Sequence, residues 1–374
     1  MIYQNFLRPL LFALSRNDPE TAHEHALRLL EWFDSDSGRR RFLLSVSGVM
    51  KVRPQPKYMM GLTFFQPVGL AAGFDKNAVA VRALGDLGFG FVEVGTVTPR
   101  PQDGNPRPRI FRLGDDRALI NRMGFPSQGA DAVAARLAAR PWLRDVPLGV
   151  NIGKNKDTPL HKAAGDYREV MKKLYEYADY LVINVSSPNT PVLRSLQGKE
   201  ELDWLLGEVM EENVILAQEF AIRHPVLVKL SPDLTEQALD EALEILVKHG
   251  VSGVIATNTT LSRDGLSAPV NETGGLSGAP LRQRALDAVS HVRRRLPYMP
   301  LIGVGGVDDA DSARTMLDAG ADLVQLYTCL IYRGPFLAVA IARALAETPA
   351  IAPAPKAKAP PGSVQENSSV RPAA

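Results

Sequence analysis

The stretch from Leu301 to Thr328 reads LIGVGGVDDADSARTMLDAGADLVQLYT. An apolar run at Leu301–Val307 precedes a segment with helical spacing at Ala310–Ala319, and a second apolar run follows at Leu323–Thr328. Gly320 lies directly after the helical segment, where glycine commonly ends a helix. Apolar runs without polar alternation are typical of parallel strands that are buried on both faces. The stretch therefore predicts a strand, a helix and a second parallel strand.

The same alternation recurs from residue 61 to about residue 347. The apolar runs predict strands at Pro67–Ala72, Phe89–Val97, Val146–Gly153, Tyr180–Ser187, Val226–Leu230, Gly253–Thr259, Leu301–Val307 and Leu323–Thr328. The segments between and after them predict helices at Asn77–Leu87, Gln128–Ala139, Leu160–Tyr177, Lys199–Arg223, Thr235–Lys248, Leu281–Leu296, Ala310–Ala319 and Pro335–Ala346.

Eight such units predict an α/β fold, a (β/α)8 TIM barrel. A doubly wound open sheet is the alternative. It favours G-x-G-x-x-G after the first strand, whereas residues 71–77 read AAGFDKN. The barrel is therefore the preferred prediction.

Residues 1–60 form a separate N-terminal zone, which we interpret as a helical extension and a linker. Pro19 and the short connection before it favour a helical hairpin. Two interpretations stay open: the helices pack against the barrel, or their apolar faces anchor the protein at a membrane surface. The apolar side chains are Phe6, Leu7, Leu10, Leu11 and Leu14 in the first helix and Ala22, Ala26, Leu29, Leu30 and Phe33 in the second.

Residues 348–374 are rich in alanine, proline and serine, and they offer almost nothing to bury. Such a composition predicts disorder. The predicted organisation is thus an extension at 1–60, a barrel at 61–347 and a disordered tail at 348–374.

Composition argues against several classes of protein. The 43 basic and 41 acidic side chains nearly balance, so nothing indicates a nucleic-acid partner. Cys329 is the only cysteine, which rules out an internal disulfide and a cysteine-based zinc or iron–sulfur site. The six histidines are scattered, so we expect no metal site. No apolar stretch reaches the roughly 18 residues of a transmembrane helix.

In barrels of this kind the active site lies at the carboxyl ends of the strands. These ends carry amides, hydroxyls and glycines together with Lys76 and Lys229, and no histidine. Asp75 and Glu93 are the only carboxylates in or near them, so hydrolysis by paired carboxylates is a poor fit. A Ser-His-Asp site is also a poor fit. The pattern favours a planar ligand with several hydrogen-bonding edges, because amides both donate and accept.

Glycines follow the seventh predicted strand, at Gly303–Gly306, and Tyr327 and Thr328 end the eighth. The loops after these strands often form the phosphate site of such barrels. A tight turn into a helix is the alternative interpretation of the glycines, but their position favours a phosphate site.

Four motifs, in this order, resemble the dihydroorotate dehydrogenase family. They are GTVTPRPQDGNPRPR at Gly95–Arg109, NRMGF at Asn121–Phe125, INVSSPN at Ile183–Asn189 and LIGVGGVDDADSARTMLDAGA at Leu301–Ala321. The resemblance covers roughly residues 1–346. The cytosolic class of the family carries S-C-P-N with a cysteine base, whereas the membrane-associated, quinone-dependent class 2 carries S-S-P-N and an N-terminal helical extension. Ser186–Asn189 reads SSPN, which is similar to class 2.

The resemblance implies oxidation of (S)-dihydroorotate to orotate with FMN, in de novo pyrimidine (UMP) biosynthesis. Ser187 is the implied base at C5, assisted by Thr190 and Phe125. The alternative for Ser187 is a turn serine, since SSPNT is rich in turn-forming residues. The implied substrate ligands are Lys76, Asn121, Arg122, Met123, Gly124, Phe125, Asn184, Asn189, Asn258 and Thr259.

Two lysines have distinct implied roles. Lys76 binds the substrate carboxylate, although a solvated loop lysine is its ordinary interpretation. Lys229 lies near the N1/O2 edge of the flavin, where a cation stabilises the charge of the reduced ring. A lysine at the end of an apolar strand is costly unless paired, which favours a functional role by itself. The implied FMN ligands are Ala72, Gly73, Phe74, Asp75, Lys76, Thr96, Asn151, Asn184, Lys229, Thr257, Gly278, Gly306, Tyr327 and Thr328.

The arginine-rich segment Arg100–Arg117 is interpreted as a lid or hairpin over the flavin site. Acidic residues interrupt it and no series of stacking aromatics accompanies it, which argues against nucleic-acid binding.

The resemblance also implies partners. A membrane quinone, ubiquinone or menaquinone, accepts the electrons, and the extension contacts the lipid bilayer. We therefore expect a peripheral protein on the cytoplasmic face of a bacterial inner membrane that requires no protein partner. Three alternatives stay open: a cytosolic dehydrogenase of the same fold that reduces fumarate or a nicotinamide, a non-catalytic flavin-binding membrane scaffold, and a barrel lyase or synthase acting on a phosphorylated substrate.

Overall fold

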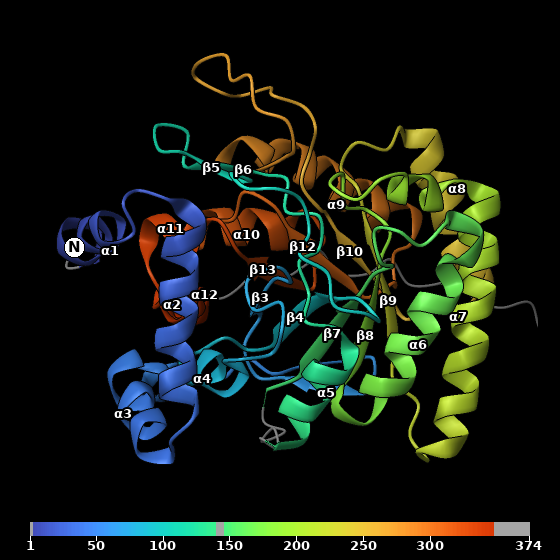
Figure 1. Ribbon diagram of the computed structural model, residues 1–374, viewed down its shortest axis with the longest axis horizontal. Helices are drawn as coiled ribbons and strands as arrows, with labels where there is room; N and C mark the ends of the chain where they lie inside the picture. Colours follow the sequence, from blue (N-terminus) through green and yellow to red (C-terminus); the bar gives the residue numbers. More distant parts are fainter. Residues whose placement is uncertain (1–2, 140–145, 348–374) are drawn as a thin grey trace, which may run out of the picture.

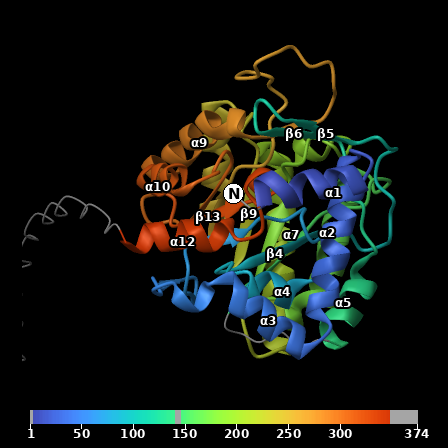
Figure 2. The same cartoon turned by 90° about the vertical axis from the view of Figure 1, so that its left-hand side faces the viewer.

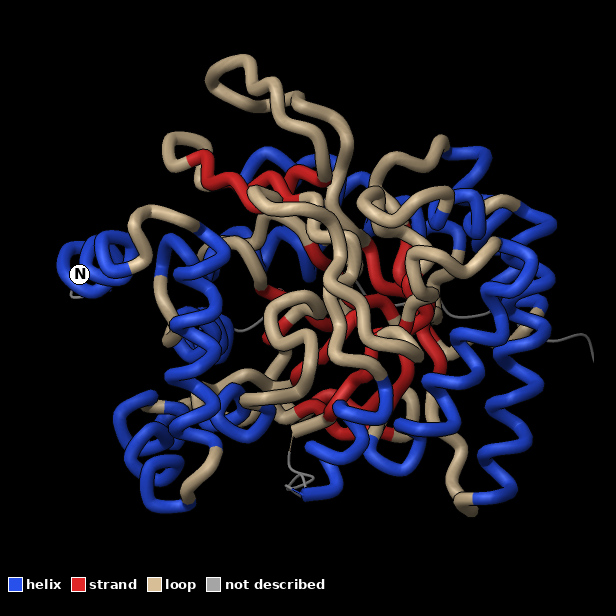
Figure 3. The backbone as a smooth tube through the Cα atoms, in the orientation of Figure 1, coloured by secondary structure: helices blue, strands red, loops and turns tan. Residues whose placement is uncertain are grey.

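The computed structural model describes residues 3–139 and 146–347, and the tail predicted at 348–374 lies outside this range. Within it the strands gather at the centre and helices surround them (Figure 1, Figure 3). The N-terminal helices lie against one side of this assembly (Figure 1).

The central strands form a closed barrel in which every neighbouring pair is parallel. Each strand falls within one predicted apolar run, so the predicted (β/α)8 barrel is confirmed and the open sheet is ruled out. The spatial order is β10-β12-β13-β3-β4-β7-β8-β9. The strands are β3 (Val68–Leu70), β4 (Val92–Val97), β7 (Leu148–Ile152), β8 (Tyr180–Asn184), β9 (Val226–Leu230), β10 (Gly253–Ala256), β12 (Leu301–Val304) and β13 (Leu323–Leu326).

Helices follow the barrel strands as predicted. Helix α4 starts four residues later than its predicted start at Asn77. The reason is the Asp75 carboxylate, which accepts the backbone N–H groups of Asn77, Val79 and Ala80 and holds them in a turn. The helices are α4 (Val81–Asp86), α5 (Ala130–Ala139), α6 (Ala163–Leu174), α7 (Lys199–Glu219), α8 (Glu236–Lys248), α9 (Arg282–Arg295), α10 (Ala310–Asp318), α11 (Cys329–Arg333) and α12 (Leu337–Glu347).

The barrel interior has two layers, because alternate residues of a strand point to the same side. The lower layer is apolar, and the rings of Phe64 and Phe91 pack edge to face with centroids 5.4 Å apart. Two residues further along the strands the side chains become polar, yet they stay buried. The lower layer contains Phe64, Phe91, Tyr180, Val182, Leu227, Ile255, Ile302 and Leu323, and the upper layer contains Glu93, Asn151, Asn184, Lys229 and Gln325.

The N-terminal extension contains both predicted helices, α1 (Arg8–Leu14, after a π-helical turn η1 at Tyr3–Leu7) and α2 (Pro19–Asp34). The two helices cross instead of lying antiparallel as a tight hairpin (Figure 2). The turn η1 is held by α11, since the Tyr3 hydroxyl donates to the Ile331 carbonyl at 3.1 Å.

A third helix, α3 (Ser37–Ser47), was not predicted from the sequence. Asp36 caps its start by accepting the Arg39 N–H at 2.9 Å, and Gly48 ends it with φ 76°. Arg40 then pairs with Asp86 of α4 at 2.7 Å, which holds the extension against the barrel.

Smaller strands close both ends of the barrel. The hairpin of β1 (Lys57–Met59) and β2 (Leu62–Phe64) packs under the apolar layer. An antiparallel sheet of β5 (Ile110–Leu113), β6 (Ala118–Asn121) and β11 (Gly275–Gly278) lies at the opposite end, where the carboxyl ends of the barrel strands open. The predicted lid segment supplies β5 and therefore forms part of a hairpin there.

Candidate active site

A cavity lies at the carboxyl ends of the barrel strands. Its wall combines residues that end or follow β3, β4, β8, β9, β10, β12 and β13 with residues from β6, β11 and their neighbouring loops. Concave sites of this kind, with a few converging polar groups, are typical of small-molecule and cofactor binding.

The polar upper layer forms the floor of the cavity and is joined by hydrogen bonds. Gln325 Nε2 donates to Glu93 Oε2 at 2.5 Å, and Asn151 Nδ2 donates to Glu93 Oε1 at 2.8 Å. Thr96 Oγ1 donates to Asn151 Oδ1 at 2.5 Å, and Asn184 Nδ2 donates to Thr96 Oγ1 at 2.9 Å. This network fixes the orientation of the amides before any ligand arrives.

Lys229 brings a positive charge to this floor. Its Nζ lies 3.9 Å from Glu93 Oε1, and both side chains are buried. Burial lowers the pKa of Lys229, and the Glu93 carboxylate acts in the opposite direction. The ammonium thus lines the cavity with its counter-charge behind it, which is the arrangement that a buried cation requires.

Ser187 lies on the loop after β8 and lines the cavity, with little exposure. Its Oγ accepts the backbone N–H of Asn189 at 3.3 Å. The Asn189 side chain in turn donates to Asn121 Oδ1 at 3.1 Å. The serine is therefore tied to the segment after β6, on the other side of the cavity.

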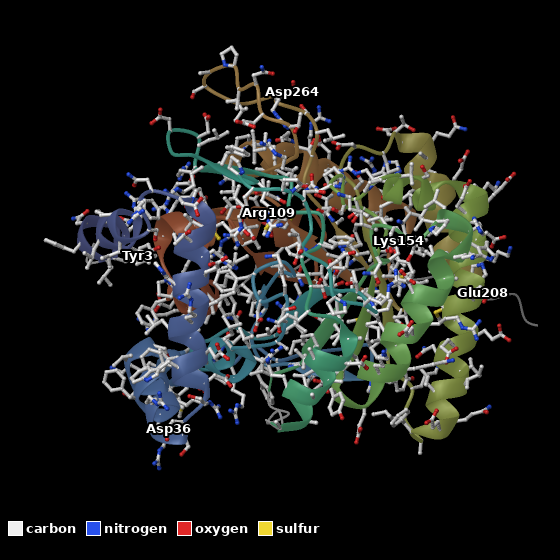
Figure 4. All side chains as sticks on the ribbon, in the orientation of Figure 1. Tyr3, Asp36, Arg109, Lys154, Glu208 and Asp264 are labelled. Carbon is white, nitrogen blue, oxygen red and sulfur yellow. The ribbon has the colours of Figure 1, made fainter. Side chains whose placement is uncertain are left out.

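Lys76 lies after β3, and its Nζ donates to the Gly73 carbonyl at 2.5 Å. Burial lowers the pKa of Lys76 to about 8, with Glu20 acting to raise it and Arg109 to lower it. Glu20 comes from α2 and forms a forked ion pair with Arg109, with a shortest N–O distance of 2.7 Å. Arg109 is labelled in Figure 4. The N-terminal extension thus contributes charge at the edge of the site.

Two glycines shape the part of the cavity near the β5–β6 turn and the loop after β12. A Cβ on Gly278 would lie 2.3 Å from the Arg117 carbonyl oxygen, and one on Gly306 would lie 2.4 Å from Arg282 Cβ. Both glycines also have positive φ, of 99° and 70°. Only glycine fits such positions without strain, and a backbone without side chains lets a phosphate approach closely.

The cavity brings together most of the residues singled out from the sequence. Those that line it are Ala72, Gly73, Lys76, Thr96, Asn121, Met123, Gly124, Phe125, Asn184, Ser187, Asn189, Lys229, Thr257, Asn258, Thr259, Gly278, Gly306, Tyr327 and Thr328.

Some of the predicted site residues do not line the cavity. Asp75 is fully buried in the turn before α4, and burial raises its pKa. Arg122 points instead to Glu272, with an N–O distance of 2.6 Å. The predicted residues outside the lining are Phe74, Asp75, Arg122, Asn151 and Thr190.

Sequence reasoning missed several residues of the wall. Gln325 was detectable, because it is the one polar side chain inside the run LVQL. The others come from the β5–β6 turn, from the loop after β12 and from α11, and their approach to the cavity depends on tertiary packing. They include Arg117, Asp308, Cys329, Tyr332 and Arg333.

No cluster of three or more His, Cys, Asp or Glu side chains with the makings of a metal site occurs in residues 3–139 or 146–347. Among the described helices, none has the length and apolar content needed to cross a membrane.

Comparison with known proteins places these observations in a family. Residues 56–348 match the family model described as dihydroorotate dehydrogenase. The chain belongs to the dihydroorotate dehydrogenase family. It is therefore an oxidoreductase of a flavin-dependent family, and the resemblance found in the sequence motifs is confirmed.

Individual members of the family cover almost the whole chain. Proteins named dihydroorotate dehydrogenase (quinone) from Chloroflexus aurantiacus and Salinispora arenicola are 48% and 50% identical to it. The matches cover 92% and 93% of this chain, and 96% and 100% of those proteins. The crystal structure of DHODH in complex with ferulenol from Eimeria tenella is similar with a TM-score of 0.76 and 38% identity, covering 87% of this chain and 90% of that one.

Proposed function

We propose that FMN is the cofactor with which this chain oxidises (S)-dihydroorotate to orotate, in the pathway to UMP, and that a membrane quinone takes the electrons. The observation that carries the proposal is that Lys76, Ser187 and Lys229 line one cavity. Lys76 supplies a cation for the substrate carboxylate, and Ser187 supplies a hydroxyl that can accept a substrate proton. Lys229 supplies a cation for the reduced flavin ring.

The cavity fits FMN by the chemistry of its wall. Gln325 Oε1 and Thr259 Oγ1 are buried and have no hydrogen-bond partner within the described residues, so each can meet a ligand. Gly278 and Gly306 would face the phosphate, and Lys229 would face the ring edge. When bound, FMN accepts a hydride and later releases two electrons.

Lys76 would hold the carboxylate of dihydroorotate by a charge-assisted hydrogen bond. The amides of Asn121, Asn184, Asn189 and Asn258 would meet the polar edges of the pyrimidine ring, since an amide both donates and accepts. These contacts orient C5 of the substrate toward Ser187.

Ser187 would take the proton from C5. A serine hydroxyl is a weak base, so the proton must move onward as it is taken. Thr190 lies in the same loop, and its Oγ1 is buried without a hydrogen-bond partner among the described residues. Phe125 lines the cavity and would limit access of bulk water.

Three aromatic rings in successive contact connect α2 with the cavity wall, and they support the proposal that the quinone is reduced on the side of α2. His23 packs edge to face on Phe74 with centroids 5.0 Å apart, and Phe74 packs on Tyr327 at 6.4 Å. His23 Nε2 is buried and has no hydrogen-bond partner among the described residues. Burial, followed by the charge of Lys76, lowers the pKa of His23 to about 3, so a neutral ring faces this route.

The outer surface of the extension suits a lipid bilayer. Apolar side chains on its three helices are exposed, and basic side chains such as Arg28 and Arg41 lie among them. This combination is typical of helices that lie in a membrane interface. We propose that this surface contacts the cytoplasmic face of a bacterial inner membrane. The exposed apolar residues are Phe6, Leu7, Leu10, Leu14, Leu29, Trp32, Phe42 and Val46.

The visible spectrum of the purified protein tests the oxidation. The protein should be yellow, release FMN on denaturation and bleach when dihydroorotate is added without oxygen. A decyl-chain ubiquinone should then restore the colour. A colourless protein, or a yellow one that dihydroorotate does not bleach, would contradict the proposal.

Sedimentation with vesicles tests the membrane contact. The double variant Leu10→Ser/Leu14→Ser should stay in the supernatant while the unmodified chain pellets. Tyr298→Ser is the matched control, because Tyr298 is 88% exposed and lies outside the extension. Equal pelleting of all three proteins would exclude the exposed face of α1 as the anchor.

A further inference from the structure

The loop after β8 carries Ser187 and runs from Val185 to Val192; we call it the serine loop. A short 3-10 helix, η5 (Leu193–Gln197), follows it. The serine loop has no strand or helix of its own, so other contacts must set its position.

Arg194, in η5, supplies such contacts. Its Nε donates to the Ser186 carbonyl at 2.9 Å and closes the serine loop on itself. Its Nη2 donates to the Thr259 carbonyl at 2.8 Å, on the loop after β10. Its Nη1 pairs with Asp233 Oδ2 at 2.7 Å, on the loop after β9. One planar fork thus joins the loops that follow three adjacent barrel strands.

Asp233 is fixed from the other side as well. It accepts a hydrogen bond from the Thr260 hydroxyl and another from the Leu261 backbone N–H at 2.8 Å. Burial acts to raise the pKa of Asp233, but the hydrogen bonds from Thr260, Leu261 and Arg194 outweigh it and lower the pKa. The carboxylate therefore stays charged and holds the guanidinium in place.

Of the two carbonyls that Arg194 binds, one belongs to Thr259 in the cavity wall and the other to Ser186, next to the wall. Ser186 precedes Ser187, and Thr259 follows Asn258, whose Nδ2 donates to Ser186 Oγ at 2.9 Å. Arg194 itself does not line the cavity. It can therefore act on the reaction only through the loops that it joins.

We propose that Arg194, paired with Asp233, is a positioning residue that holds Ser187 where it removes the proton from the substrate. This inference rests on the proposed function. A base must lie within hydrogen-bonding reach of the proton that it removes, and a misplacement of about 1 Å can cost about 100-fold in rate.

Rapid mixing of the full-length holoenzyme with dihydroorotate, without oxygen, tests the inference. Arg194→Ala should reduce its flavin about 100-fold more slowly than the unmodified enzyme. Arg194→Lys keeps the charge but not the fork, so its rate should lie between the two. FMN content and the rate of reoxidation by quinone should stay unchanged, because Arg194 does not line the cavity.

Arg263→Ala is the matched control. Arg263 also donates to loop carbonyls, those of Glu272 and Gly274, at 2.7 and 2.8 Å, but within the described part of the chain none of its hydrogen bonds reaches the serine loop. Its flavin should be reduced at the unmodified rate. If Arg263→Ala slows flavin reduction as much as Arg194→Ala does, the inference is overturned, because the effect would not be specific to the arginine that contacts the serine loop.

Two milder variants decide the outcome if Arg194→Ala fails to fold or to keep FMN. Arg194→Lys and Asp233→Asn should each slow flavin reduction, and the double variant should be no slower than the slower single one, because the pair acts as a unit. If both single variants reduce their flavin at the unmodified rate, the inference about Arg194 is overturned and the proposed function is not. An unmodified enzyme that does not bleach would overturn the proposed function and this inference with it.

Discussion

The two ends of the barrel interior differ in what the same strands carry. Near the amino ends, Leu227 of β9 and Leu323 of β13 pack in an apolar layer. Two residues further on, Lys229 and Gln325 form the floor of the cavity. Because the period of a strand is two residues, one short strand serves the core with its first inward side chain and the ligand with its second. Substitutions in the two layers should therefore separate stability from catalysis.

The largest effect is expected above the upper layer, at Ser187→Ala. Loss of a proton-transferring group costs about 10²- to 10⁴-fold in rate. Flavin reduction by dihydroorotate should slow by that factor, whereas the protein should stay yellow and its melting temperature should not change. Rapid-mixing absorbance measures the rate, and rapid bleaching would remove Ser187 from its role.

Phe91→Ala, in the lower layer, should have the opposite effects: it should lower the stability of the fold and leave the rate of flavin reduction unchanged. Its ring is fully buried against Phe64 and the backbone of Gly69, so truncation leaves a cavity. The expected loss is about 3–5 kcal/mol in the free energy of unfolding. Denaturant unfolding measures it. An unchanged rate of flavin reduction in the folded fraction is expected, and a rate loss as large as that of Ser187→Ala would break the comparison.

Glu93→Gln should make FMN binding sensitive to alkaline pH. Burial already lowers the pKa of Lys229, and the substitution removes the carboxylate that opposes this. The folded-state pKa of Lys229 therefore falls further, and its positive charge is lost at lower pH as the pH rises. FMN affinity, measured by fluorescence between neutral and alkaline pH, should decline earlier than in the unmodified protein. Identical pH profiles would show that Lys229 does not act through its charge.

Ile255→Val should have the smallest effect. Ile255 belongs to the lower layer, and Thr257, two residues further on, lines the cavity. Removing one buried methylene costs about 0.5–1.5 kcal/mol in the free energy of unfolding. Thermal unfolding should record this loss with no change in flavin content, and reduced flavin content would show that the layers are coupled.

Much of the site could be predicted because the motifs lie at strand ends, which a barrel brings together. Ser187, Lys76 and Lys229 lie far apart in the chain and line one cavity for this reason. Asp75 was predicted in the same way, but its carboxylate binds backbone N–H groups of its own turn. Proximity to a strand end does not say where a side chain points, since local hydrogen bonds compete for it.

Features that depend on long-range packing escaped prediction. Helix α3 has a polar and basic start, and its pairing with α4 through Arg40 and Asp86 joins residues 46 positions apart. The contribution of Arg117 and Arg333 to the cavity wall likewise follows from how the β5–β6 turn and α11 meet there. The sequence around one residue of such a contact does not indicate which distant residue it contacts.

The sequence by itself determined the number and order of the barrel strands, the barrel and the side chains at the strand ends. These follow from periodicity and local chemistry, which each segment carries alone. Only the tertiary structure decided that Glu93 lies behind Lys229, that Glu20 of the extension reaches the edge of the site, and that Arg194 joins three loops. Those contacts exist because barrel closure brings distant residues within hydrogen-bonding distance, and no local pattern encodes that distance.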